Sequence, residues 1–107
     1  MSKLLKKNAD YLSLLLRTHS HKQAIALLVT ATTDQIQAIS EIALNLVNLP
    51  LSGEAEAQVN KRRRFLERIG NNHSSLKARA RLLKRNHRIL LEILHPVTGQ
   101  ILRLLGK

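Results

Sequence analysis

The sequence predicts an all-α protein: a small bundle of about five helices, with an N-terminal three-helix unit followed by two long basic helices. Three observations lead to this fold class. Apolar residues recur at helical spacing along most of the chain. No alternation of apolar and polar residues, as in a strand, extends over more than a few positions. Finally, 44% of the 107 residues are apolar but only two are aromatic, which favours a core of packed aliphatic helices within one domain.

The first predicted helix covers about residues 3–18, where leucines repeat on one face. The second begins after Ser20, because Ser20 and Gln23 have the spacing of a capping box. It continues to about Ala31 and directs its alanine, isoleucine and leucine side chains inward. These two helices supply much of the aliphatic surface of the N-terminal half.

The third predicted helix has the clearest signals at its two ends. Thr33 is expected to cap it, and Asp34 lies in the first turn, where the helix dipole favours a negative charge. The helix should end near Asn48, because Pro50 disfavours a helical conformation at the residue before it. Residues 1–49 are therefore predicted to form an aliphatic three-helix unit.

Residues 50–107 are predicted to form a basic helical hairpin with a leucine-rich tail, within one domain overall. The hairpin could fold back on the three-helix unit or project from it. Its first helix covers about 52–69 and is expected to stop at Gly70, followed by two asparagines, in a left-handed C-terminal conformation.

The second helix of the hairpin is expected to begin at Ser74 or Ser75 and to reach about Leu94, before Pro96. Beyond it lies a short tail, with Gly99 as the expected break. The tail combines leucines with one arginine, which leaves open a further leucine core, an oligomer contact, or an amphipathic helix on a membrane or partner protein.

Charge is distributed very unevenly along the chain. The formal net charge is +11, and residues 61–88 contain eleven basic side chains but one acid, Glu67. An ordinary solvated helix face interleaves acids with bases. Arginine outnumbers lysine in this segment, and its planar guanidinium suits phosphate oxygens. We predict nucleic-acid binding by Lys61, Arg62, Arg63, Arg64, Arg68, Lys77, Arg79, Arg81, Lys84, Arg85 and Arg88.

The expected contact is with the backbone of duplex DNA, independent of sequence, because cations spaced along a helix can neutralise successive phosphates. Two aromatic rings provide no platform for stacking single-stranded bases. The start of the helix at Ser75 is also poor in the amide side chains that read base edges. The run Arg62-Arg63-Arg64 is compatible with a nuclear localisation signal as well.

Catalytic and metal-binding functions are not predicted. The chain has no cysteine, and its carboxylates and five histidines show no spacing typical of a metal site or catalytic dyad. His87 is expected to pack on the apolar face of its helix. No apolar run is long enough to cross a membrane, and no secretion signal is evident. We therefore expect a non-enzyme without cofactor, without a transmembrane segment and not secreted.

Residues 28–34, 37–48, 49–52, 62–66 and 75–83 carry a recognisable order of features, from an aliphatic helix to a basic segment. That order resembles small basic open reading frames of polinton-like, adintovirus-like and adomavirus-like double-stranded DNA elements of animals. The chain departs from the family pattern in the central segment, where the family's cysteine is Ser40 or absent, and in the tail.

That resemblance implies a virus-encoded protein of the virion core, located in the virion or the host nucleus. Together with the charge, it predicts a non-enzymatic, sequence-independent DNA-binding or DNA-condensing protein. Two alternatives remain open: a structural protein that binds an acidic capsid or partner surface, and a membrane-active amphipathic protein. A capsid protein and a second copy of the chain are further candidate partners.

Overall fold

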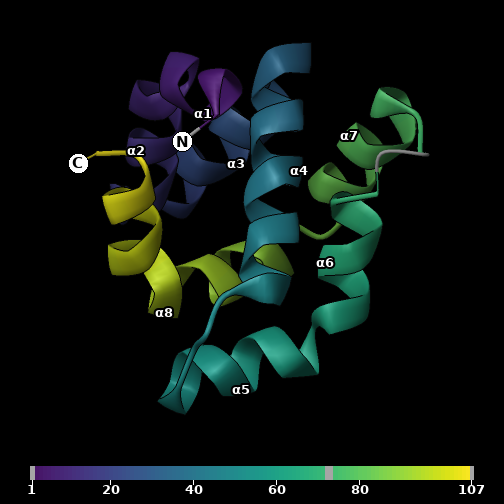
Figure 1. Ribbon diagram of the computed structural model, residues 1–107. Coiled ribbons are helices and arrows are strands. Elements are labelled where there is room, and N and C mark those ends of the chain that lie inside the picture. The colour runs from purple at the N-terminus through teal and green to yellow at the C-terminus, as the bar shows by residue number, and fades with distance from the viewer. Residues whose placement is uncertain (1, 72–73, 107) are drawn as a thin grey trace.

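The computed structural model describes residues 2–71 and 74–106, and over these residues the chain is helical without strands (Figure 1). The all-α class is confirmed, but the described residues form eight helices where the sequence predicts about five. The helices are α1 (Lys3–Lys7), α2 (Ala9–Arg17), α3 (His21–Val29), α4 (Thr33–Asn48), α5 (Gly53–Lys61), α6 (Arg63–Ile69), α7 (Leu76–Arg85) and α8 (His87–Leu104).

The larger number arises because three predicted helices are each interrupted by one residue: Asn8, Arg62 and Asn86. Each has φ between −106° and −118° and ψ between 16° and 32°, outside the helical region. At two breaks the asparagine Nδ2 donates 2.9 Å hydrogen bonds to the carbonyl four residues earlier, that of Leu4 or Leu82. Such local bonds compete with regular helix and favour a change of direction.

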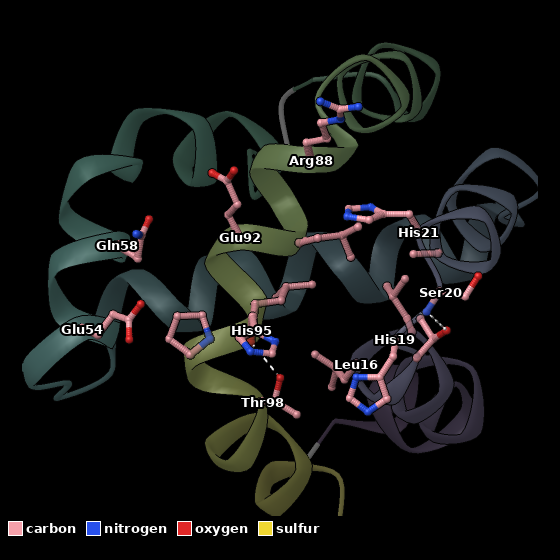
Figure 2. A pocket seen from close by; sticks show the side chains of 16 residues that line it. Leu16, His19, Ser20, His21, Glu54, Gln58, Arg88, Glu92, His95 and Thr98 are labelled. Atoms are coloured by element: carbon pink, nitrogen blue, oxygen red, sulfur yellow. Dashed lines mark hydrogen bonds between the residues drawn. The ribbon is translucent and has the colours of Figure 1, made fainter.

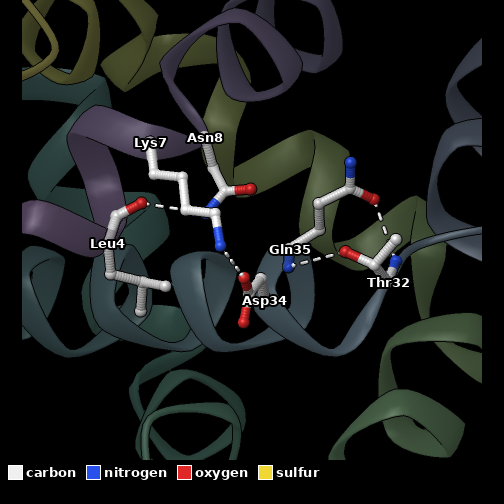
Figure 3. A network of polar contacts seen from close by, with 6 residues as sticks. All are labelled: Leu4, Lys7, Asn8, Thr32, Asp34 and Gln35. Carbon is white, nitrogen blue, oxygen red and sulfur yellow. Dashed lines mark hydrogen bonds and ion pairs between the residues drawn. The ribbon is translucent and has the colours of Figure 1, made fainter.

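Side-chain caps fix where several helices begin. Ser20 caps α3 and Ser75 caps α7, each accepting from a backbone N–H three residues later. The sequence predicts the cap at Ser20 and leaves Ser74 or Ser75 open for α7. The capping box predicted at Ser20 is only half formed, because Gln23 Oε1 accepts from the Thr18 hydroxyl instead of the Ser20 N–H. The prediction that Thr33 caps α4 is wrong by one residue. Thr32 Oγ1 accepts from the Gln35 N–H at 3.2 Å, and Gln35 Oε1 accepts from the Thr32 N–H at 2.9 Å (Figure 3). This reciprocal pair satisfies two amide donors at once.

Gly70 ends α6, but for a different reason from the one expected. Its φ is −81° and ψ −2°, so the predicted left-handed conformation is wrong. A Cβ at this position would lie 3.1 Å from the Leu44 Cβ and 3.3 Å from the Leu44 Cα. Glycine is therefore needed because it lets the end of α6 approach the backbone of α4.

The tail does not form a separate segment, and the expected breaks at Pro96 and Gly99 are wrong. α8 continues through both residues, and Val97, Ile101 and Leu105 are at most 4% exposed. A proline within a helix costs about 3 kcal/mol, whereas burying three aliphatic side chains contributes roughly 5 kcal/mol or more. The apolar side chains of the tail are thus part of the core.

α4 lies at the centre of the bundle and contacts α1, α2, α5, α6 and α7, while α8 packs against α2, α5 and α7 (Figure 1). Both halves of the chain contribute to one hydrophobic core, which crosses the predicted boundary at residues 49–50. The radius of gyration is 12.5 Å, close to the ~13 Å of a compact domain of this size. The basic helices therefore fold back on the N-terminal helices. The largest fully buried side chains are Leu12, Leu46, Leu66, Ile69, Leu83, Leu90, Ile93, Val97 and Ile101.

Polar contacts join the N-terminal helices to one another. Lys7 Nζ lies 2.6 Å from Asp34 Oδ2, an ion pair between α1 and the first turn of α4 (Figure 3). The Tyr11 hydroxyl of α2 donates a 2.8 Å hydrogen bond to the Leu27 carbonyl of α3. Burial raises the pKa of Tyr11 to about 12, because desolvation disfavours the phenolate.

Candidate nucleic-acid interface

The candidate interface is built on α6 and α7, which pack against each other and against α4 (Figure 1). α6 turns Leu66 and Ile69 inward, and α7 turns Leu83 inward. Residues four positions apart lie on one side of a helix, so the positions between these apolar anchors face outward. On both helices the outward positions are mainly basic.

Nine of the eleven predicted binding residues have exposed side chains. They extend from the last residue of α5, along α6 and α7, to the first turn of α8. We call them the basic surface: Lys61, Arg63, Arg64, Arg68, Lys77, Arg81, Lys84, Arg85 and Arg88. On α7 the exposed cations recur at the i, i+4 and i+7 spacing of one helix face.

Arg62 and Arg79 do not belong to this surface. Arg62 is half-buried at the break between α5 and α6, and Arg79 is 7% exposed on the inner side of α7. The buried Nε of each has no hydrogen-bond partner among the residues that the structure describes. The prediction that Arg79 contacts phosphate is corrected: it lies four residues before Leu83, on the side of α7 that packs on the bundle.

The protein's own acids leave the basic surface almost entirely uncompensated. Over residues 2–71 and 74–106, one ion pair involves these cations, between Arg63 and Glu67, with 3.9 Å between nitrogen and oxygen. Both side chains of that pair are about half exposed, and such i,i+4 pairs contribute only ~0.3–0.5 kcal/mol. A concentrated set of unpaired cations creates a positive potential that attracts polyanions.

Two further features, a metal site and a membrane-spanning helix, are absent from the described part of the chain. No group of three or more His, Cys, Asp or Glu side chains there is arranged to hold a metal ion. His87, expected to be packed, is half-buried at the start of α8, with Nδ1 3.2 Å from the Lys84 carbonyl oxygen. None of the described helices combines the length and apolar character required of a membrane span.

The structure also contains a feature that the sequence analysis missed. A groove of about 690 Å³ lies between the α2–α3 link, α5 and α8, and it is lined in part by Glu54 and Glu92. Its residues come from three distant parts of the chain. No local pattern of spacing could have brought them together before the fold was known.

Comparison with protein-family models, with curated proteins and with solved structures finds no match to this chain. The resemblance to small basic proteins of animal DNA elements therefore stays a prediction. A functional proposal has to be based on the geometry and charge of the chain itself.

Proposed function

We propose that this protein binds duplex DNA without sequence specificity, through the basic surface on α6 and α7, and condenses it. The observation that carries this proposal is the exposure of nine cations along α6, α7 and the adjoining ends of α5 and α8, with a single ion pair to them within residues 2–71 and 74–106. Self-repulsion within such a surface is relieved when its cations bind phosphates, and the release of the counterions condensed on the DNA favours binding. The cations contact charge rather than base edges, so affinity should vary little with sequence.

The proposal includes a role in a virion core, with a location in the virion or the host nucleus. It is supported by the sequence resemblance and by the small size and net charge of +11. A protein that coats packaged DNA has to neutralise phosphate over long stretches, and affinity for any sequence serves that purpose. No enzymatic role is proposed, and no cofactor is required.

The direct test is a salt titration of binding to two unrelated duplexes. If six to nine cations reach phosphates, the slope of log K against log salt should be about −5 to −8. A variant with Arg63, Arg64 and Arg68 changed to glutamine should bind more weakly, with a slope reduced in magnitude by about 3. The affinities for the two duplexes should remain similar.

A matched control removes three positive charges from a part of the molecule outside the basic surface. Lys3, Lys6 and Arg17 are exposed on α1 and α2, so changing all three to glutamine lowers the net charge equally. This control should retain most of the wild-type slope. Equal losses in both variants would show attraction by net charge alone, and a slope near zero for the wild-type protein would contradict DNA binding.

The alternative partner is an acidic protein surface, such as the inside of a capsid. It would use the same exposed cations, so the charge alone does not separate the two partners. Co-purification with shell protein after nuclease treatment would favour this alternative, whereas loss of the association after nuclease supports DNA as the partner.

A further inference from the structure

The groove is an open trough whose floor is the exposed side of α8. In Figure 2, α8 runs between α5, which carries Glu54 and Gln58, and the start of α3, where His19 precedes the helix and His21 is its first residue. The volume of about 690 Å³ is within the range of specific binding sites in proteins. The groove therefore has one wall from each half of the chain.

The lining of the groove is amphipathic. Leu16, Leu91 and Pro96 are half-buried and present apolar surface, while polar side chains surround them. Grooves with apolar surface and charged edges are the sites in which amphipathic helices dock. The lining thus suits a helix that offers both aliphatic carbon and charge.

The charge of the groove is opposite to that of the molecule. Glu54 and Glu92 give −2 and Arg88 gives +1, a formal −1 with neutral histidines, whereas the whole chain carries +11. Neither carboxylate has a hydrogen bond or ion pair within residues 2–71 and 74–106. Two unpaired carboxylates in a protein with eighteen lysines and arginines can accept cations from outside the chain.

Proline adds a backbone acceptor at the same place. Pro96 has no N–H, so the carbonyl of Glu92 lacks the donor that residue 96 normally supplies within a helix. Glu92 and Pro96 both line the groove.

From these observations we infer that the groove binds the outer face of α7 from a second copy of this chain. That face is exposed and carries Lys77, Arg81, Lys84 and Arg85, whose methylene chains offer aliphatic carbon beside the charge. It offers the cations that Glu54 and Glu92 lack. The groove and the outer face of α7 are different surfaces, so the contact is head-to-tail and can extend from copy to copy.

The role of this contact in coating DNA rests on the proposed function, but the contact itself does not. On a duplex, repulsion between copies is reduced because phosphates neutralise part of the charge. While α7 occupies a neighbouring groove, the phosphate contacts of that copy come from Lys61, Arg63, Arg64 and Arg68, so an assembled copy contacts fewer phosphates than an isolated one. Each bound copy then presents an empty groove or a free α7 to the next.

The test is sedimentation of the protein without DNA, at an ionic strength that screens long-range repulsion. One variant reverses the groove, with Glu54→Lys and Glu92→Lys, and a second reverses α7, with Lys77→Glu and Lys84→Glu. Wild-type protein should associate as its concentration rises. Each variant alone should associate at least about tenfold more weakly, because like charges then face each other.

An equimolar mixture of the two variants should restore association, because every groove then meets an α7 of opposite charge. A matched control, Glu56→Lys with Glu67→Lys, changes the net charge as much as the groove variant but at exposed residues outside the groove. It should associate more strongly than the groove variant. Carbodiimide coupling should also join Glu54 or Glu92 of one wild-type copy to Lys77 or Lys84 of another.

Monomeric wild-type protein at every concentration would overturn this inference, as would a mixture of the two variants that fails to associate. Either result leaves the salt slope of duplex binding unaffected, so the proposed function would stand. Conversely, association without any affinity for duplexes would keep the contact and remove DNA binding. Circular dichroism of each variant shows that the helices are retained.

Discussion

α7 and α8 are adjacent parts of one predicted helix, separated by the break at Asn86, yet the bundle holds them in different ways. α8 buries Leu90, Ile93, Leu94, Val97 and Ile101. α7 buries Leu83 and, on the same inner side, Arg79. One helix is anchored by aliphatic surface, whereas the other combines few anchors with a buried charge.

The difference shows how a small basic protein can carry a charged surface and still fold. Five buried aliphatic side chains contribute roughly 1.5–3 kcal/mol each, so α8 holds the core together. α7 is free to use its outer positions for cations because little of the core depends on it. We therefore expect α7 to open locally at a lower free energy than α8.

The largest effect should come from the core side of α8. Ile93 is fully buried, so Ile93→Ala should lower the free energy of unfolding by about 3 kcal/mol through lost burial and a cavity. Leu82→Ala, at a half-buried position of α7, should cost about 1 kcal/mol. Urea denaturation measures both changes, and equal losses would contradict the contrast between the two helices.

The next effect concerns the buried charge of α7. Arg79→Met should stabilise the protein by about 1–2 kcal/mol, because an aliphatic chain replaces a guanidinium whose buried Nε has no partner. Arg81→Met, at an exposed position of the same helix, should change stability by less than about 0.5 kcal/mol.

Arg79→Met and Arg81→Met should also differ in affinity for duplex DNA, and here Arg81→Met should have the larger effect. Arg81→Met should weaken binding, whereas Arg79→Met should leave it nearly unchanged, because only 7% of Arg79 is exposed. A loss for Arg79→Met as large as that for Arg81→Met would mean that α7 rotates or leaves the bundle when it binds DNA.

Substitution of two glycines by alanine compares the cost of a close packing contact with the gain in helix propensity. Gly70→Ala should destabilise by about 1–2 kcal/mol, because its Cβ would approach the Leu44 backbone to 3.3 Å. Gly99→Ala lies in open space within α8 and should stabilise by about 0.5–1 kcal/mol. Thermal melts compare the two, and stabilisation by both would show that α6 and α4 can move apart without loss.

The last effect concerns the N-terminal half, at the hydrogen bond that joins α2 to α3. Tyr11→Phe should cost about 1 kcal/mol at neutral pH, because the hydrogen bond to the Leu27 carbonyl is lost. The pKa of Tyr11 is raised to about 12, above the value near 10 in an unfolded chain. Its contribution should therefore be complete below about pH 10 and disappear as the pH rises towards 12.

The phenylalanine variant should lack that alkaline component of the loss. The check is a series of urea denaturation curves between pH 9 and 12 for both proteins. Parallel curves for the two proteins over the whole range would show that Tyr11 ionises as easily in the folded state as in the unfolded chain.

Much of the candidate site could be predicted from local sequence. Cations that recur along a helix face reach solvent when the opposite face is apolar, and nine of the eleven do so. Arg79 could not be assigned in this way. It lies at the edge between the two faces of α7, and the rotation of that helix against α3, α4 and α6 decided its burial.

The sequence by itself determined the all-α class, the cap at Ser20, a cap at Ser74 or Ser75, and the concentration of charge in residues 61–88. These depend on neighbours within one or two turns, where spacing and hydrogen bonding are local. Only the tertiary structure decided that α8 continues through Pro96, that Gly70 is a point of close approach, and that Glu54 and Glu92 share a groove. Each of these depends on contacts between residues distant along the chain, whose energies exceed local preferences.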